Sequence, residues 1–278
     1  MTYRNLLVHI DDGKAAEGRL AAAIALARAH GAHLTGLYVG VDPVLPANLR
    51  AEVPPHFLAT LRDQLDERIA SAEARFTAAV ERAGLSADCR TARCPATSVP
   101  EVIARHARYA DLVILGQREP DERGDVEGDV AEDVVLSSGR PALVIPYIGA
   151  GKTLGERVMV AWDAGREAAR AVGDAMPMLE RAGSVVVLVI NPRKGDHGQE
   201  PGADISLHLA RHGIKVEAQQ IDAKELTVAD ALLSRLADEA IDLLVMGAYG
   251  HSRLREWVLG GTTRQIFEQM TVPVLMSH

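Results

Sequence analysis

The 278-residue chain has little of several features that mark whole classes of protein. It contains two cysteines, Cys89 and Cys94, which excludes a disulfide-stapled scaffold and leaves ordinary free thiols as the expectation. No apolar run approaches the roughly 20 residues of a membrane-spanning helix. Acidic residues outnumber lysine and arginine by 38 to 30, and the resulting net charge of −8 argues against a nucleic-acid or membrane-surface partner.

What the chain does have is aliphatic residues. Hydrophobic residues make up 47% of the sequence although aromatic residues make up only 4%, so enough apolar surface exists to offset the entropy of folding. The N-terminal segment MTYRNLLVHIDDG carries a charge from the fourth residue on, which is untypical of a signal peptide. We therefore expect a cytoplasmic protein.

The second half of the chain repeats the first. An apolar run that ends in an acid, LLVHIDD at 6–12, has its counterpart in VMVAWD at 158–163, and each is followed by an Ala-rich helical stretch. DLVILG at 111–116 likewise matches DLLVMG at 242–247. We therefore expect two copies of one domain, over 1–148 and 155–278, which differ mainly in a long loop and helix before residue 83 of the first copy.

In each half, short apolar strands alternate with helices. Continuous apolar runs such as SVVVLVI at 184–190 indicate strands covered on both faces, as in a parallel sheet, whereas the alternating pattern at 214–219 indicates a strand nearer an edge. The predicted fold is α/β: two tandem open, mostly parallel five-stranded sheets flanked by helices. Ligands of such sheets bind beyond the carboxyl ends of the strands.

A glycine pattern in the second half is the strongest signal of a site. Gly247 and Gly250 follow a strand, and Gly260 and Gly261 precede a helix expected at 263–270. Glycines allow the backbone to approach a ligand closely, and the amides at a helix start face an anion. Thr262 and Gln265 form a predicted capping box. Spacing alone leaves two readings open, a phosphate-binding loop and an ordinary glycine-rich turn with a capped helix.

The segment DLLVMGAYGHSRLREWVLGGTTRQIFEQMTVPVLM closely resembles the C-terminal signature of the universal stress protein family. That signature is a strand, Gly-x2-Gly-x9-Gly-Ser/Thr, a helix and a final strand, and the VAWD run at 160–163 resembles the family's first strand. The resemblance covers both halves and implies a tandem member with a Rossmann-like fold related to the adenine nucleotide alpha hydrolases. One departure is Gly261, which stands where the family usually has Ser or Thr.

The resemblance implies an adenine nucleotide, ATP or its AMP and ADP relatives, in the second domain, together with a Mg²⁺ ion near Asp163. By the same resemblance, Asp163 lies near ribose and metal, Ala161 and Trp162 flank the base or ribose, and Val189 holds the adenine. For Trp162, packing in the core is an equally good reading. The remaining residues implied at the nucleotide and its phosphates are Met246, Gly247, Gly250, His251, Gly260, Gly261, Thr262 and Thr263.

The first half lacks the second glycine and is acidic at the same place. Eight acids and one arginine lie between Glu119 and Asp133, and Asp129 occupies the family's Ser/Thr position. A triphosphate is disfavoured beside so many like charges. We therefore interpret this half as a degenerate nucleotide site and its acidic run as a solvated loop that also suits a helix start.

Other motifs in the sequence do not indicate a functional site, because their surroundings do not fit. Gly149–Thr153 ends like a Walker A loop, but Pro146 stands where its first glycine belongs and a strand follows instead of a helix. His208 and His212 stand four apart on a helix without a third ligand, so surface histidines are the better interpretation. No Gly-x-Ser-x-Gly elbow supports hydrolase chemistry.

The function implied is nucleotide binding coupled to a stress response, without a dedicated catalytic residue. Two alternatives stay open: a nucleotide-free interaction module, and an enzyme that uses an adenylated intermediate or hydrolyses ATP slowly. Because family members commonly dimerise through the final strand, we expect Leu143–Ile145 and Val274–Met276 to pair within one chain as an intrachain pseudo-dimer. Homodimerisation of the whole chain and a protein partner stay open.

Overall fold

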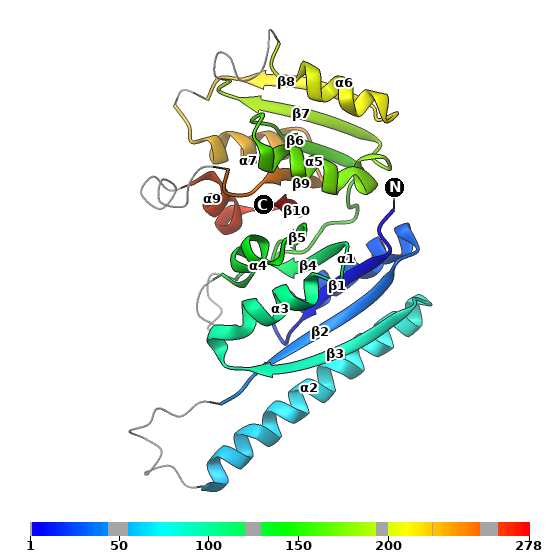
Figure 1. The fold of residues 1–278 in the computed structure, drawn as a ribbon, viewed down its shortest axis with the longest axis vertical. Coiled ribbons are helices and arrows are strands. Elements are labelled where there is room, and N and C mark those ends of the chain that lie inside the picture. The colour runs from blue at the N-terminus through cyan, green and yellow to red at the C-terminus, as the bar shows by residue number, and fades with distance from the viewer. Residues whose placement is uncertain (1, 44–54, 120–128, 193–199, 224, 251–260) are drawn as a thin grey trace.

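The structure is a computed structural model of the whole chain. It describes residues 2–43, 55–119, 129–192, 200–223, 225–250 and 261–278. Two halves of like architecture meet in the middle of one extended sheet (Figure 1). The sequence-predicted residues His251 and Gly260, and most of the acidic run after Glu119, lie outside the described residues.

The first half alternates strands and helices in the predicted order. Its strands are Asn5–Ile10 (β1), His33–Val41 (β2), Ala87–Cys94 (β3), Leu112–Gly116 (β4) and Ala142–Ile145 (β5). Its helices are Ala16–His30 (α1), Pro55–Ala83 (α2), Val99–Ala107 (α3), preceded by a 3₁₀ turn at Ala96–Ser98 (η1), and Val130–Ser138 (α4). The predicted long helix before residue 83 is therefore present as α2.

The second half repeats this order with a much shorter second helix. Its strands are Arg157–Ala161 (β6), Ser184–Ile190 (β7), Val216–Ile221 (β8), Leu243–Gly247 (β9) and Val274–Ser277 (β10). Its described helices are Arg166–Leu179 (α5), Ala203–Arg211 (α6), Val228–Asp238 (α7) and Thr262–Gln269 (α9). The Gly149–Thr153 segment lies between β5 and β6, without a following helix, as expected.

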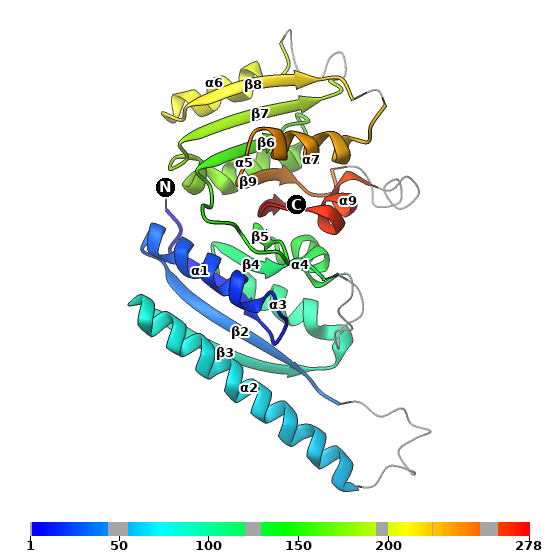
Figure 2. The ribbon, with the colours of Figure 1, turned by 180° about the vertical axis from the view of Figure 1, so that it is seen from behind.

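The ten strands form a single sheet in the order β3-β2-β1-β4-β5-β10-β9-β6-β7-β8. Every pairing is parallel except that between β5 and β10, which run antiparallel with Leu143 opposite Leu275. The predicted pairing of the two final strands within one chain is thus confirmed, and it fuses the two predicted sheets into one. The strand with the alternating pattern, β8, lies at an outer edge, as predicted (Figures 1 and 2).

Each face of the sheet carries one continuous hydrophobic core. Helices α1, α2, α5 and α6 cover one face, and α3, α4, α7 and α9 cover the other. Because the equivalent helices of the two halves lie on the same face, both cores run across the junction between β5 and β10. The chain is therefore held together by apolar packing as well as by strand pairing.

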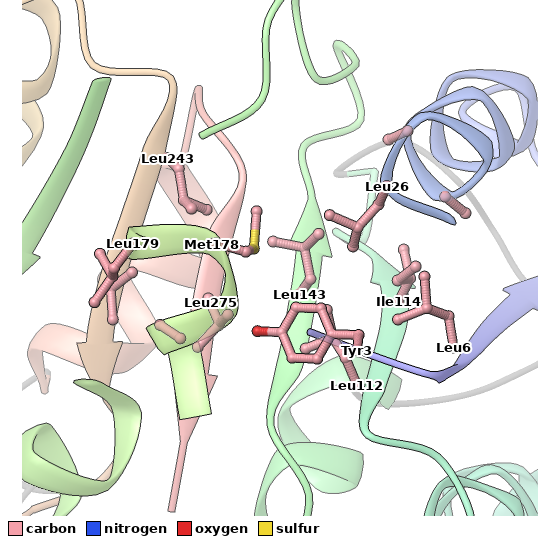
Figure 3. Packing of buried hydrophobic residues seen from close by; sticks show 14 of the residues in the cluster. Tyr3, Leu6, Leu26, Leu112, Ile114, Leu143, Met178, Leu179, Leu243 and Leu275 are labelled. Carbon is pink, nitrogen blue, oxygen red and sulfur yellow. The ribbon is translucent and has the colours of Figure 1, made fainter. Parts of the chain in front are cut away.

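Polar contacts add to the apolar packing at the junction. Figure 3 shows Tyr3 and Met178 beside Leu143 and Leu275 of the two central strands. The Tyr3 ring is 4% exposed, and its hydroxyl donates a hydrogen bond of 2.8 Å to the carbonyl of Asp174 in α5. Burial, with the nearby charge of Asp174, raises the pKa of Tyr3 above its ordinary value, so the hydroxyl remains a donor throughout the physiological range.

Among the described residues, no helix is both long enough and apolar enough to cross a membrane.

The junction hydrogen bond can be tested by Tyr3→Phe, which removes the hydroxyl and keeps the ring. We expect the free energy of unfolding to fall by about 1 kcal/mol, because the Asp174 carbonyl loses a buried donor. Urea denaturation measures this change. Tyr109→Phe is the matched control, since Tyr109 is 82% exposed. Equal stabilities for the two variants would show that the bond contributes nothing.

Candidate functional site

The predicted site residues of the second half gather at the carboxyl ends of β6 and β9. The segment from Gly247 to Gly250 leaves β9, lies beside Asp163, which follows β6, and hydrogen-bonds Thr263, in the first turn of α9. Three of the predicted elements, the acid, the glycine segment and the helix start, therefore form one cluster, in the place where open α/β sheets bind their ligands.

Gly247 is a glycine because a helix start passes directly over it. A β-carbon at this position would lie 2.6 Å from the backbone nitrogen of Ala168 in α5 and 2.6 Å from the carbonyl carbon of Glu167. These neighbours are backbone atoms, so they cannot swing away as a flexible side chain could. Any other residue here would push α5 off the sheet, and the glycine therefore sets the spacing between α5 and β9.

Two further contacts shape the turn after Gly247. Tyr249 has a φ of 57°, in the left-handed region that residues with a side chain rarely adopt. Its backbone amide donates a hydrogen bond of 3.2 Å to the hydroxyl of Thr263, whose side chain is buried. Thr263 thus holds the glycine turn against α9, a structural contact that the resemblance did not imply.

The start of α9 lacks a side-chain cap. Gly261 is its N-cap residue, and no side chain caps the helix there. The predicted capping box of Thr262 and Gln265 is wrong, because the Gln265 amide donates to Asp230 at 2.7 Å, at the start of α7, and not back to its own helix. Among the described residues, the first amides of α9 consequently have no side-chain cap.

The equivalent helix of the first half is capped by its own sequence. The Asp129 carboxylate accepts from the amides of Ala131 at 3.0 Å and Glu132 at 3.2 Å, so the start of α4 already holds an anion. The predicted role of this acid as a suitable helix start is confirmed. The two halves therefore differ at the N-cap position of this helix. In α4 the Asp129 carboxylate caps the first amides, whereas in α9 the N-cap residue is Gly261, which has no side chain to do so.

A second carboxylate, which the sequence analysis missed, lies beside Asp163. Glu167, in the first turn of α5, is 6% exposed, and one of its oxygens lies 3.3 Å from the β-carbon position of Gly250. An Asp163 oxygen lies 3.7 Å from the same point, and the other accepts from the Gly165 amide at 2.8 Å. The sequence signal that could have identified Glu167 is the spacing Asp-x3-Glu, which spans the end of a strand and the start of a helix.

The charge state of Glu167 depends on its neighbours. Burial alone would raise its pKa, but a hydrogen bond of 2.5 Å from Arg166, with the positive charge of that residue, holds the pKa of Glu167 below its ordinary value. Glu167 is therefore ionised at neutral pH. Two carboxylates converging on a glycine turn suit a Mg²⁺ ion, which takes one or two carboxylates and completes its shell with water and phosphate oxygens.

The residues implied to surround the base divide between the two faces of the sheet. Ala161 and Met246 pack on the α7 and α9 face, the face of the open helix start. Trp162 and Val189 pack on the opposite face, Trp162 partly buried and Val189 fully buried. Successive residues of a strand point to opposite faces, so Ile190, not Val189, is the residue at the end of β7 that packs on the α7 and α9 face.

The remaining sequence candidates are unconnected to this cluster. The rings of His208 and His212 touch edge to face on the exposed side of α6, which confirms their surface position. Cys89 and Cys94 are free, and burial raises the pKa of both thiols, which makes them poor nucleophiles. Within the described parts of the chain, no group of three or more metal-ligating side chains occurs.

A contact between the two halves reaches the α9 helix from its other end. Gln117, directly after β4, is 5% exposed, and its amide nitrogen donates to the carbonyls of Phe267 at 2.9 Å and Glu268 at 3.3 Å. These carbonyls belong to the last turn of α9, where the backbone carbonyls have no N–H donors within the helix. The first domain thus fixes the position of the helix whose other end forms the site.

Comparison with known proteins agrees with the observed fold. The family model described as the universal stress protein family matches residues 2–146 and again 155–278. This chain belongs to the universal stress protein family. A universal stress protein of Synechocystis is 36% identical over 83 residues, a match that spans only 29% of each chain.

Two solved structures resemble the chain over nearly its whole length. A universal stress protein from Archaeoglobus fulgidus superposes with a TM-score of 0.74 at 18% identity, covering 98% of this chain and 95% of its own. A putative universal stress protein from Pseudomonas aeruginosa gives a TM-score of 0.55 at 17% identity, covering 99% and 93%. At these identities the likeness shows the tandem universal stress protein fold and no more.

The first universal stress protein domain contains a pocket at the equivalent strand ends. Its volume is about 360 Å³, and it lies beyond β1, β2 and β4. His9 lines this pocket with its side chain 14% exposed. Burial, together with the charge of Arg19 and despite that of Asp11, lowers the pKa of His9 to about 4, so the imidazole is neutral at pH 7.

Because His9 is neutral in the folded chain, the free energy of unfolding should fall as the pH is lowered. Its pKa is about 6.5 in the unfolded chain and about 4 in the folded one, so the unfolded chain takes up the proton first as the pH falls. Between pH 7 and pH 4.5 this group should cost the native state about 2 kcal/mol. His9→Gln should therefore lose less stability over that interval than the parent chain, by about that amount, in urea denaturation. Parallel losses would contradict the shift.

Proposed function

We propose that the second domain binds an adenine nucleotide, ATP in the first instance, and that this binding serves a stress response in the cytoplasm. The observation that carries the proposal is the open start of α9. Gly261 leaves its amides without a side-chain cap, in a domain whose counterpart helix is closed by Asp129. Amides at a helix start, aided by the helix dipole, bind phosphate oxygens.

The glycine turn supports the same conclusion. Gly250 is exposed and adjoins α9 through the bond between Tyr249 and Thr263. A residue without a side chain here lets phosphates approach the backbone closely. In this arrangement the amides of α9 would bind the phosphates beside the glycine turn, and Met246 and Ile190 lie on the same face of the sheet for the base.

Two carboxylates near phosphates require a cation. Asp163 and Glu167 would repel a triphosphate alone. The same two carboxylates would hold a Mg²⁺ ion, which would supply the charge neutralisation that a triphosphate needs there. The ionised Glu167, oriented by Arg166, contributes a fixed negative partner for the ion.

Calorimetric titration of the chain with Mg-ATP tests the site. We expect one equivalent to bind, and Gly250→Asp to abolish binding, because the new carboxylate would stand against Glu167 and Asp163. Gly173→Asp is the matched control: it adds the same charge at an exposed position of α5 with no atom near the new β-carbon, and it should bind as the parent does.

Three outcomes of this titration separate the candidate functions. No binding at millimolar ATP would leave a nucleotide-free interaction module as the better description. Binding with turnover above roughly 1 s⁻¹ would favour an enzyme instead, since ordinary enzymes reach at least that rate. Binding with slow or no turnover supports the proposal.

Glu167→Gln tests the role of the metal ion. The substitution keeps the shape of the side chain and removes its charge. We expect affinity for Mg-ATP to fall about tenfold, as one charged ligand is lost, and affinity for ATP in excess chelator to rise, because a repulsion is removed. Glu156→Gln, at an exposed position beside β6, is the control. Equal changes with and without Mg²⁺ would exclude Glu167 as a metal partner.

A further inference from the structure

The pocket of the first domain has an apolar wall. Val39, Val99 and Leu115, which are 8%, 2% and 1% exposed, present their side chains along it. Its volume of about 360 Å³ falls within the range of roughly 300–1,000 Å³ typical of small-molecule sites. The space therefore suits a molecule with a flat or compact apolar body.

The helix start on the polar side of this pocket is already occupied. The amides at the start of α4 are occupied by the Asp129 carboxylate, which itself lines the pocket. Burial raises the pKa of Asp129, with a further contribution from the negative charge of Glu132. An anionic ligand would raise the cost of this buried carboxylate further.

Two of the arginines that line the pocket, Arg19 and Arg68, are paired with carboxylates. Arg19, 4% exposed, places a guanidinium nitrogen 2.7 Å from an Asp11 oxygen, and its Nε donates to the His9 carbonyl. Arg68 donates to an Asp12 oxygen at 3.0 Å, beside the hydroxyl of Tyr38 at 2.7 Å. These pairs fix the geometry of the pocket and leave little positive potential for an anion.

The charges of the lining side chains confirm this imbalance. The described residues that line the pocket include four acids and three arginines, namely Asp11, Asp12, Glu119, Asp129, Arg19, Arg68 and Arg118. Arg118 acts electrostatically on Asp129, and the His9 imidazole is neutral at pH 7. Carboxylate oxygens are hydrogen-bond acceptors, so the ligand groups that they favour are hydroxyl, amino and ammonium groups.

We propose that the first-domain pocket binds a phosphate-free molecule of nucleoside size, uncharged or singly cationic, whose ring packs against Val39 and Leu115 and whose donors face Asp11 and Asp129. The two domains then discriminate by charge, the second taking a phosphorylated ligand and the first its phosphate-free counterpart. This proposal rests on the proposed function in one respect: adenine is chosen as the ring of the probe molecules because the second domain is proposed to bind an adenine nucleotide.

Calorimetry on the Gly250→Asp chain, whose second site is closed, isolates the first domain. Adenosine, AMP and ATP are the probes. We expect adenosine to bind with one equivalent per chain and AMP to bind at least about tenfold more weakly, because its phosphate meets the Asp129 carboxylate. ATP should show no binding to this variant.

Two further variants locate the binding and test its charge selectivity. Val130→Trp, at the first position of α4 and in the pocket lining, should abolish adenosine binding, whereas Val228→Trp, at the first position of α7, should not. Asp129→Asn keeps an oxygen for the helix cap and removes the charge. It should raise AMP affinity about tenfold and leave adenosine affinity nearly unchanged.

The outcomes distinguish this proposal from the previous one. The pocket proposal fails if adenosine does not bind the Gly250→Asp chain, if AMP binds it as tightly as adenosine, or if Val130→Trp binds adenosine as the parent does. The second-domain proposal is tested separately, by whether ATP binds to the parent chain. Either proposal can therefore fail while the other stands.

Discussion

The antiparallel pairing of β5 with β10 is the interaction on which the rest of the molecule depends. It joins two five-stranded sheets edge to edge, and so removes two strand edges that would otherwise face solvent. It also aligns the helices of both halves into two continuous cores. Through the same junction Gln117 reaches the last turn of α9, so the helix that begins at the second-domain site is positioned by the first domain.

Within this shared framework, the two domains have diverged by small local changes of charge. Asp129 occupies the helix start of α4 that Gly261 leaves open in α9. The two domains also differ in what packs over the glycine that ends β4 in the first domain and β9 in the second. Over Gly116 it is the buried Arg19 guanidinium, paired with Asp11, whereas over Gly247 it is the backbone of α5. One fold thereby has a helix start without a side-chain cap in one half and a carboxylate-lined pocket in the other.

Much of the fold was predictable because its signals are local. Unbroken apolar runs predicted the buried strands, and the alternating pattern predicted that β8 lies at an edge. The pairing of Leu143–Ile145 with Val274–Met276 was expected from the family resemblance. The site was predictable only in part. The direction of Gln265, which bonds Asp230 and not its own helix, depends on how α7 packs against α9, and no local pattern contains that contact.

The sequence by itself determined the two-domain α/β architecture, the family and the strand ends at which the candidate site lies, because hydrophobic period and glycine spacing act over short stretches of chain. Tertiary structure decided which side chains share a face and which charges meet. It placed Glu167 beside Asp163, put Val189 on the face opposite α9, and enclosed a pocket around His9 and Arg19. These outcomes depend on distances between elements far apart in the chain, which only the packed sheet and its helices fix.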